Sequence, residues 1–139
     1  MSNTEKTKKI ITSGKRKAAV ARAIITEGIG DVRVNNKDYR AMSLFDRLRI
    51  EEPIRIAKEI LGKTNFDVSI EVRGGGQSGQ IESARLALAR AISEFEKSKE
   101  LTEAFSTYDR NLLVADVRRK EARKPGDSKA RAKRQASKR

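Results

Sequence analysis

Alternation of apolar and polar residues along the chain predicts several short strands. Residues 17–26 are rich in small and β-branched side chains, and in the segment DVRVNN the residues Val32 and Val34 point to one face. The turn-forming sequence EGIGD lies between these two segments, so we expect them to form a hairpin. The segment FDVSIEV, residues 66–72, alternates in the same way and predicts another strand, and NLLVADV, residues 111–117, predicts a last one.

Helical spacing of apolar residues predicts the remaining elements. A main helix is expected over residues 53–61, with a shorter helical turn before it at residues 43–48 and Gly62 as its C-terminal stop. Residues 81–98 carry an apolar stripe typical of an amphipathic helix, and residues 99–106 predict a short further helix. The order β-β-α-β-α-α-β followed by a tail indicates an α+β fold, in which helices cover a small sheet as an α/β sandwich.

Composition narrows the chemistry that such a fold can perform. The 139 residues carry a net charge of +13 and give a pI near 10.3. The chain has no Cys and no His, which removes disulfides, thiolate chemistry, the usual general base and the commonest metal ligand. It also lacks a long apolar run and an apolar signal segment, so we expect a soluble, intracellular protein that enters no membrane. We expect no catalytic residues, metal site, cofactor or small-molecule substrate.

The positive charge is concentrated at the C-terminus. Residues 118–139 contain eleven Lys or Arg and two acids, a net +9, and no Val, Ile, Leu, Phe, Tyr or Trp, whereas residues 1–117 carry +4. Such a segment cannot bury enough apolar surface to offset its chain entropy, and it binds polyanions through counterion release. A membrane surface would need apolar anchors beside the charge, so a nucleic acid is the favoured partner. We therefore predict a globular RNA-binding domain, residues 1–117, and an extended basic tail, residues 118–139.

A glycine-rich motif, VRGGGQSGQIE, lies at the junction of a predicted strand and a predicted helix. Gly74, Gly76 and Gly79 match the G-x-G-x-x-G of a dinucleotide-binding loop, but the region that should hold the ribose-binding acid is helical, and the chain is too short for the required sheet. The spacing of a P-loop is also present, but Gln80 replaces its lysine. Two interpretations stay open: a flexible turn, or a site where backbone N–H groups and a helix N-terminus meet a phosphate of a nucleic-acid strand.

Five segments of the sequence resemble the small-subunit ribosomal protein nine family. They are TSGKRKAAVARA, VRVNN, EVRGGGQSGQIESARLALARAI, KARAKRQ and the terminal SKR, at residues 12–23, 32–36, 71–92, 129–135 and 137–139. Their order and spacing agree with the family over nearly the whole chain. The segment ADVRRKEARKPG is similar to the archaeal and eukaryotic branch, whereas the terminal QASKR lacks the penultimate aromatic residue common in that branch.

The resemblance implies both a fold and a function. The implied fold is that of the second domain of ribosomal protein five, a four-stranded sheet with an unusual left-handed βαβ crossover, where the general rule is right-handed. The implied function is that of a structural constituent of the small ribosomal subunit in the cytoplasm. Such a protein binds the head, or 3′ major, domain of the small-subunit rRNA beside neighbouring head proteins, and its tail reaches the anticodon stem-loop of the P-site tRNA. The alternative is a nonspecific nucleic-acid-binding chaperone that uses the same tail.

Candidate binding residues follow from the charge, the glycine motif and the resemblance. The rRNA-binding candidates in the body are Lys15, Arg16, Lys17, Arg22, Arg73, Gly74, Gly75, Gly76, Gln77, Ser78, Gly79 and Gln80. The rRNA-binding candidates in the tail are Arg118, Arg119, Lys120, Arg123, Lys124, Lys129, Arg131, Lys133 and Arg134. The resemblance places the tRNA contact at Ser137, Lys138 and Arg139. A β-branched residue at Gly76 is expected to hinder folding or docking.

Overall fold

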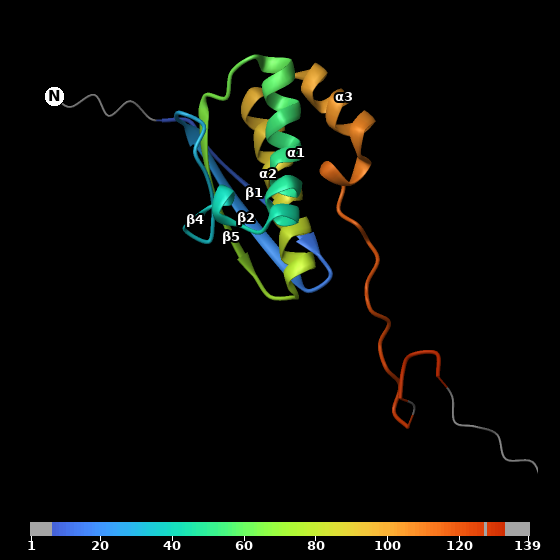
Figure 1. Cartoon of the computed structure of the whole chain (residues 1–139). Coiled ribbons are helices and arrows are strands. Elements are labelled where there is room, and N and C mark those ends of the chain that lie inside the picture. The colour runs from blue at the N-terminus through green and yellow to red at the C-terminus, as the bar shows by residue number, and fades with distance from the viewer. Residues whose placement is uncertain (1–6, 127, 133–139) are drawn as a thin grey trace, which may run out of the picture.

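A sheet covered on one face by helices forms the body of the protein. The computed structural model describes residues 7–126 and 128–132. Figure 1 shows two long helices against the sheet, a third helix beside them, and a C-terminal segment that leaves the body as extended chain. Within these described residues, no helix is long and apolar enough to cross a membrane. The predicted α+β fold is therefore confirmed.

The sheet has the strand order β1-β2-β5-β3-β4. Its strands are β1 (Lys9–Arg16), β2 (Ala19–Glu27), β3 (Val32–Val34), β4 (Lys37–Asp38) and β5 (Phe66–Arg73). β3 and β5 are parallel, and the other neighbours are antiparallel. Among the described residues the sheet thus has five strands where the resemblance implies four, and β4 is only two residues long. The chain between β3 and β5 contains a long helix, which makes a βαβ unit whose hand stays a prediction.

The first strand, β1, is not predicted by the apolar pattern. It pairs antiparallel with β2 along its whole length. Two of its buried positions are Thr12 and Gly14, so the strand shows no run of large apolar residues facing the core. The Thr12 hydroxyl donates a hydrogen bond to the Ala87 carbonyl at 2.8 Å, and a Cβ on Gly14 would lie 2.3 Å from the Ser83 carbonyl oxygen. Close contact with the helix that contains Ser83 and Ala87 therefore takes the place of the alternating large apolar residues that mark a half-buried strand.

The predicted hairpin between residues 17–26 and β3 is wrong. β2 pairs with β1 and β5, while β3 lies on the far side of β5, with Val34 opposite Ile70. The cause is the loop after β2, where Asp67 Oδ1 of β5 accepts hydrogen bonds from the backbone N–H groups of residues 29–31 at 2.9–3.2 Å. This carboxylate holds the loop across the end of β5 and directs the chain to its other edge.

Helix α1 (Leu44–Leu61) joins two segments that the sequence predicts separately. The predicted turn at residues 43–48 and the helix at residues 53–61 form one helix that continues through Pro53. A proline inside a helix removes one backbone hydrogen bond. Its ring is fully buried here, and Ile50 and Ala57 are buried on the same helix, so packing offsets that loss. Gly62 ends the helix with φ of 72°, as predicted.

Helix α2 (Gln77–Glu96) provides much of the core and packs on β1, β2 and β5. It begins four residues before the predicted start at Ile81, so part of the glycine motif forms its first turn. The predicted apolar stripe is confirmed as buried, with the members Ile81, Ala84, Leu88, Ala91, Ile92 and Phe95. This helix therefore fixes the glycine motif against the end of the sheet.

The predicted last strand at residues 111–117 is wrong. Helix α3 (Lys99–Tyr108) is followed by a 3₁₀ turn, η2 (Arg110–Leu112), and then by irregular chain. Leu112 is fully buried and Arg90 Nε donates to the Leu113 carbonyl at 2.9 Å, so this apolar segment anchors the chain to α2 and pairs with no strand. The described part of residues 118–139 is mostly exposed, and the predicted division of the chain at residue 118 stays a prediction.

Candidate nucleic-acid interface

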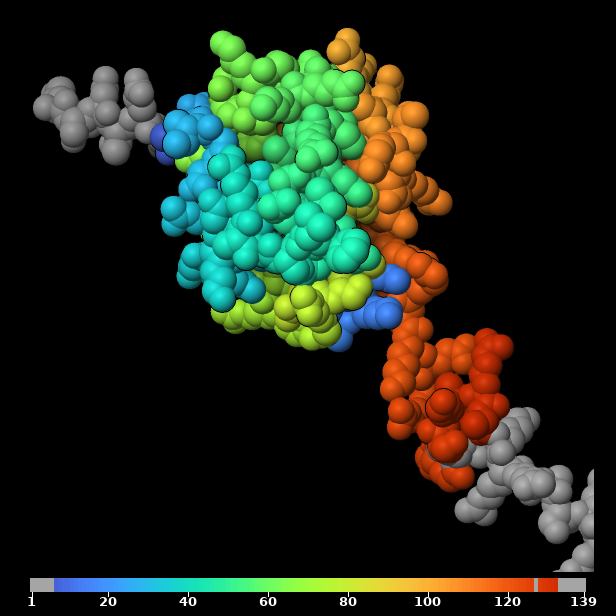
Figure 2. All heavy atoms as spheres, viewed as in Figure 1, coloured from blue at the N-terminus to red at the C-terminus, as the bar shows by residue number. Residues whose placement is uncertain are grey.

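Three segments that are distant in the sequence meet at one end of the sheet. The turn between β1 and β2, the glycine motif and the start of the tail line a groove of about 910 Å³. Figure 2 shows the blue hairpin turn close to the yellow-green glycine motif and the orange start of the tail. The lining residues are Lys15, Arg16, Lys17, Ala18, Val20, Gly75, Gly76, Arg118, Arg119 and Lys120. The structure thus gathers members of all three predicted rRNA-binding segments.

The open face of the sheet extends the positive charge of this groove. Lys15 of β1, Val20 of β2 and Arg73 of β5 stand in one cross-strand row, and all three side chains are exposed. In the neighbouring row, Arg22 lies opposite Glu71, which offsets part of its charge. The end of the sheet nearest the glycine motif is therefore the more basic end.

The glycine loop directly follows β5, and its backbone requires glycine at two positions, Gly74 and Gly75. Gly74 and Gly75 have φ of 75° and 66°, angles that other residues adopt at a cost. A Cβ on Gly74 would lie 2.8 Å from the Ala18 carbonyl oxygen, and one on Gly75 would lie 2.9 Å from Ala19. Gly76 has φ of −91°, and a Cβ there would meet no atom within 4 Å. Gly76 is therefore the open position of the loop.

The N-terminus of α2 faces the same groove through Gly76, its N-cap residue. Gly76 provides no side-chain cap, and the first N–H groups of a helix have no partner within the helix. The Gln77 side chain donates to Asp46 of α1, and the Gln80 side chain donates to the Gly74 carbonyl. These amide groups brace the loop, which leaves the backbone N–H groups and the exposed Ser78 hydroxyl as its donors for an anion.

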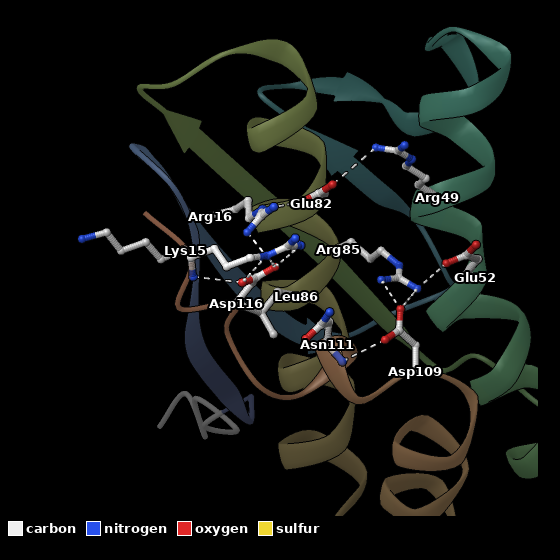
Figure 3. Close-up of a pocket in the computed structure, with 11 residues that line it drawn as sticks. Lys15, Arg16, Arg49, Glu52, Glu82, Arg85, Leu86, Asp109, Asn111 and Asp116 are labelled. Carbon is white, nitrogen blue, oxygen red and sulfur yellow. Dashed lines mark hydrogen bonds and ion pairs between the residues drawn. The ribbon is translucent and has the colours of Figure 1, made fainter. Parts of the chain in front are cut away.

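Arg16 differs from the lysines beside it because its guanidinium already holds two carboxylates. Its Nε donates to Glu82 at 2.6 Å, its Nη1 forms an ion pair with Asp116 at 2.7 Å without hydrogen-bond geometry, and its side chain is only 13% exposed. Figure 3 shows Arg16 with Glu82 and Asp116, and Arg85 with Glu52 and Asp109. The predicted role of Arg16 on rRNA stays a prediction, but much of its charge is neutralised within the body.

Acid groups at the start of the tail were not predicted as part of the site. Asp116 accepts hydrogen bonds from the side chain and the backbone N–H of Arg118, and these bonds, aided by the charge of Arg16, lower its pKa to about 2. The same pair raises the pKa of Arg118. One signal in the sequence points to such contacts: Arg85 and Arg90 fall outside the apolar stripe of α2. Their partners in the segment before the tail, Asp109 and the Leu113 carbonyl, cannot be identified from the sequence.

Comparison with known proteins decides the family. Residues 14–139 match the family model described as ribosomal protein S9/S16. The chain belongs to this family. It is 46% identical over 133 residues to the small ribosomal subunit protein uS9 of Methanococcus vannielii, which covers 94% of this chain and 98% of that protein. It is 42% identical over 129 residues to the uS9 protein of Thermoplasma volcanium, covering 92% and 96% of the two chains.

Family membership confirms several predictions. The two relatives named above are archaeal, in agreement with the resemblance of the tail to the archaeal and eukaryotic branch. A member of this family is a structural, non-enzymatic component of the small ribosomal subunit, so it takes part in translation within a ribonucleoprotein and binds RNA.

The structure describes only part of the predicted binding set in the tail. Arg118 and Arg131 are paired with Asp116 and Glu121, and both arginine side chains stay largely exposed. Arg119, Lys120, Arg123, Lys124 and Lys129 are exposed. The remaining predicted residues lie outside the described residues: Lys133, Arg134, Ser137, Lys138 and Arg139.

Proposed function

We propose that the body of this protein docks on the head, or 3′ major, domain of the small-subunit rRNA and that its tail reaches the anticodon stem-loop of the P-site tRNA. The protein then lies among the neighbouring proteins of the subunit head, on cytoplasmic ribosomes. The observation that carries the proposal is the convergence of the hairpin turn, the glycine motif and the start of the tail in one groove. Family membership supports the class of partner.

The groove suits a phosphate backbone better than a base. Lys15, Lys17 and Lys120 supply flexible cations, and Arg119 can donate to a phosphate through two nitrogens. The open backbone at Gly76 and the N-terminus of α2 allow a phosphate to approach closely. Among the described residues, no aromatic side chain lines this groove, so we assign it to phosphate contacts and shape, with little base readout.

The tail supplies the longer reach. Its net charge of +9 and lack of large apolar side chains favour an extended chain that orders on a polyanion. The described part leaves the body beside the groove, in the direction seen in Figure 1. We assign the tRNA contact to Ser137, Lys138 and Arg139 by their match to the family pattern.

A salt titration with two RNAs of equal length tests the docking proposal. One RNA is a fragment of the head domain and the other is an unrelated structured RNA. We expect tighter binding of the head fragment at every salt concentration. The double variant Lys17→Gln, Lys120→Gln should bind the head fragment more weakly. The slope of log K against log salt concentration should become shallower by about 0.9 for each phosphate that the variant leaves without a cation.

Lys63→Gln is the matched control, because Lys63 is an exposed lysine in the loop after α1 and does not line the groove. This variant should bind both RNAs as the unaltered protein does. Equal affinity of the unaltered protein for the two RNAs would contradict the docking proposal and support a nonspecific RNA chaperone.

A further inference from the structure

The segment between α3 and the basic tail is fastened to the body at four successive points. Both Nη atoms of Arg85 lie 3.2 Å from Asp109, and Leu112 is fully buried. Arg90 Nε donates to the Leu113 carbonyl at 2.9 Å, and Arg16 Nη1 lies 2.7 Å from Asp116. The attachments recur every few residues, although most of this segment has neither helix nor strand.

The arginines that make these attachments are themselves held in place. Arg16 also pairs with Glu82 of α2 at 2.6 Å, and Arg90 Nη1 donates to the Ser13 carbonyl of β1 at 3.0 Å. Arg85 also pairs with Glu52 of α1 at 2.5 Å. Figure 3 shows how Arg16 and Arg85 project from β1 and α2 toward the acids at the start of the tail. Each guanidinium thus joins two parts of the body to the segment that leaves it.

The type of side chain matters for this arrangement. A guanidinium presents a rigid, planar fork of donors and can bridge two acceptors at once, whereas a lysine ammonium is a single point charge on a flexible stem. Arg16 and Arg85 are each only 13% exposed, so solvent screens their pairs less than it screens surface pairs such as Arg131 with Glu121. A set of three such forks can define the path of an irregular segment.

We propose that Arg16, Arg85 and Arg90 are positioning residues that clamp residues 109–116 and thereby set the direction in which the basic tail leaves the body. The proposal rests on the proposed function, because a set direction is useful only if the tail has a distant target. A clamped origin confines the search volume of the tail and lowers the entropy lost when its end binds. Arg16 therefore serves the tail from within the body, while its lysine neighbours face the groove.

A purely structural role for the same ion pairs makes a different prediction. In that case, removal of one pair would lower the stability of the fold and leave the path of the tail unchanged. Asp116 separates the two cases because it is the last residue that the clamp holds before the tail begins. Asp116→Asn keeps the shape of the side chain and removes its charge for Arg16 and Arg118.

Spin-label distances in the full chain provide the test, and the absence of cysteine makes labelling selective. Labels at Ser69→Cys, exposed on β5, and Val117→Cys, exposed directly after the clamp, report the origin of the tail relative to the sheet. We expect one narrow distance distribution in the parent and loss of that narrow peak in Asp116→Asn, with the thermal unfolding midpoint nearly unchanged. A distribution as narrow as that of the parent would overturn the proposal.

A control and a second variant keep this test decisive. Asp31→Asn weakens an exposed pair with Arg33 in the loop before β3 and should leave the distribution narrow. Arg90→Lys keeps the charge but cannot bridge Leu113 and Ser13 in the same way, so it should broaden the distribution as Asp116→Asn does. Unchanged distances in Arg90→Lys would also count against the clamp.

Reconstituted small subunits separate the clamp from the proposed function. Asp116→Asn should enter subunits normally and weaken P-site tRNA binding by about two- to fivefold, the range expected for a partly exposed ion pair. If deletion of residues 137–139 leaves tRNA binding unchanged while the spin labels respond, the tail function fails and the clamp stands. If that deletion weakens tRNA binding but Asp116→Asn changes neither distance nor binding, the clamp fails and the tail function stands.

Discussion

Three consecutive glycines perform different tasks in the loop after β5. Gly74 and Gly75 adopt left-handed backbone angles and pack against Ala18 and Ala19, whereas Gly76 has an ordinary angle and faces open space. The sequence predicts that this loop needs small residues at a strand-to-helix junction. It cannot assign the tasks, because the packing partners come from a hairpin far earlier in the chain.

Substitution of Gly76 tests whether its openness serves an RNA strand. The sequence predicts that a β-branched residue there hinders folding or docking, and the open space around the position narrows this to docking. Gly76→Val should cost less than about 1 kcal/mol in the free energy of unfolding, as expected for a change of N-cap residue. It should clearly weaken binding to the head-domain RNA fragment, because a side chain would stand where a phosphate approaches.

Gly75→Val is the matched comparison for the same two measurements. Its backbone angle and its contact with Ala19 should make it destabilising by about 1–3 kcal/mol in urea unfolding. A stable Gly76→Val protein with unchanged RNA affinity would count against the close approach.

Acid should break the contacts that Asp116 makes with Arg118 and Arg16. The pKa of Asp116 is lowered from 3.8 to about 2, first by the Arg118 side chain. A carboxyl whose pKa is lowered on folding contributes fully to the stability of the folded state when the pH is above its ordinary pKa, here 3.8. That contribution to stability is lost as the pH falls through the folded-state pKa of about 2. We therefore expect the contact to persist at pH 4 and to open toward pH 2.

Carbon-13 shifts of the Asp116 carboxyl measure this titration directly. Arg118→Ala should return its midpoint toward 3.8, because the largest cause of the lowered pKa is removed. A titration midpoint of Asp116 near 3.8 in the unaltered protein would show that Asp116 and Arg118 do not pair in solution.

At the scale of elements, local pattern predicts helices better than strand pairing. The stripe of α2 and the strand β5 follow from their own residues, because one face of each is apolar and buried. β1 escapes detection because two of its buried positions are Thr12 and Gly14, and the partner of β3 depends on a distant carboxylate, Asp67. Pro53 suggests a helix break, but its ring is buried where α1 packs, so tertiary contact overrides local propensity.

Asp67 should be a key residue for the loop between β2 and β3. Asp67→Ala removes the acceptor of three backbone N–H groups and should lower the free energy of unfolding by about 1–3 kcal/mol. Asp67→Asn keeps an acceptor oxygen and should cost less. Urea unfolding provides the measurement, with Glu103→Ala on the exposed face of α3 as the control. Equal stability of Asp67→Ala and the control would contradict this role.

At the scale of the whole molecule, charge and fold are divided between body and tail. The body carries a net +4 and the apolar core, while residues 118–139 carry +9 without a large apolar side chain. The sequence alone predicts this division and the class of partner. It cannot predict that the start of the tail lies beside the hairpin turn and the glycine motif, because that arrangement depends on ion pairs between separate elements.

A chain that ends at residue 117 should therefore fold and yet bind RNA with much less salt-dependent affinity. Its unfolding midpoint should stay close to that of the full chain, because the core residues lie before residue 118. The slope of log K for RNA against log salt concentration should be shallower by about 0.9 for each phosphate that the tail neutralises. An unchanged salt dependence would assign RNA binding to the body alone.

The central claim is that the body docks on rRNA while the end of the tail contacts P-site tRNA. The most direct measurement is the affinity of P-site tRNA for isolated small subunits reconstituted with a chain that lacks residues 137–139. We expect normal incorporation of the shortened protein into subunits together with weaker tRNA binding. Normal incorporation with unchanged tRNA affinity would contradict it.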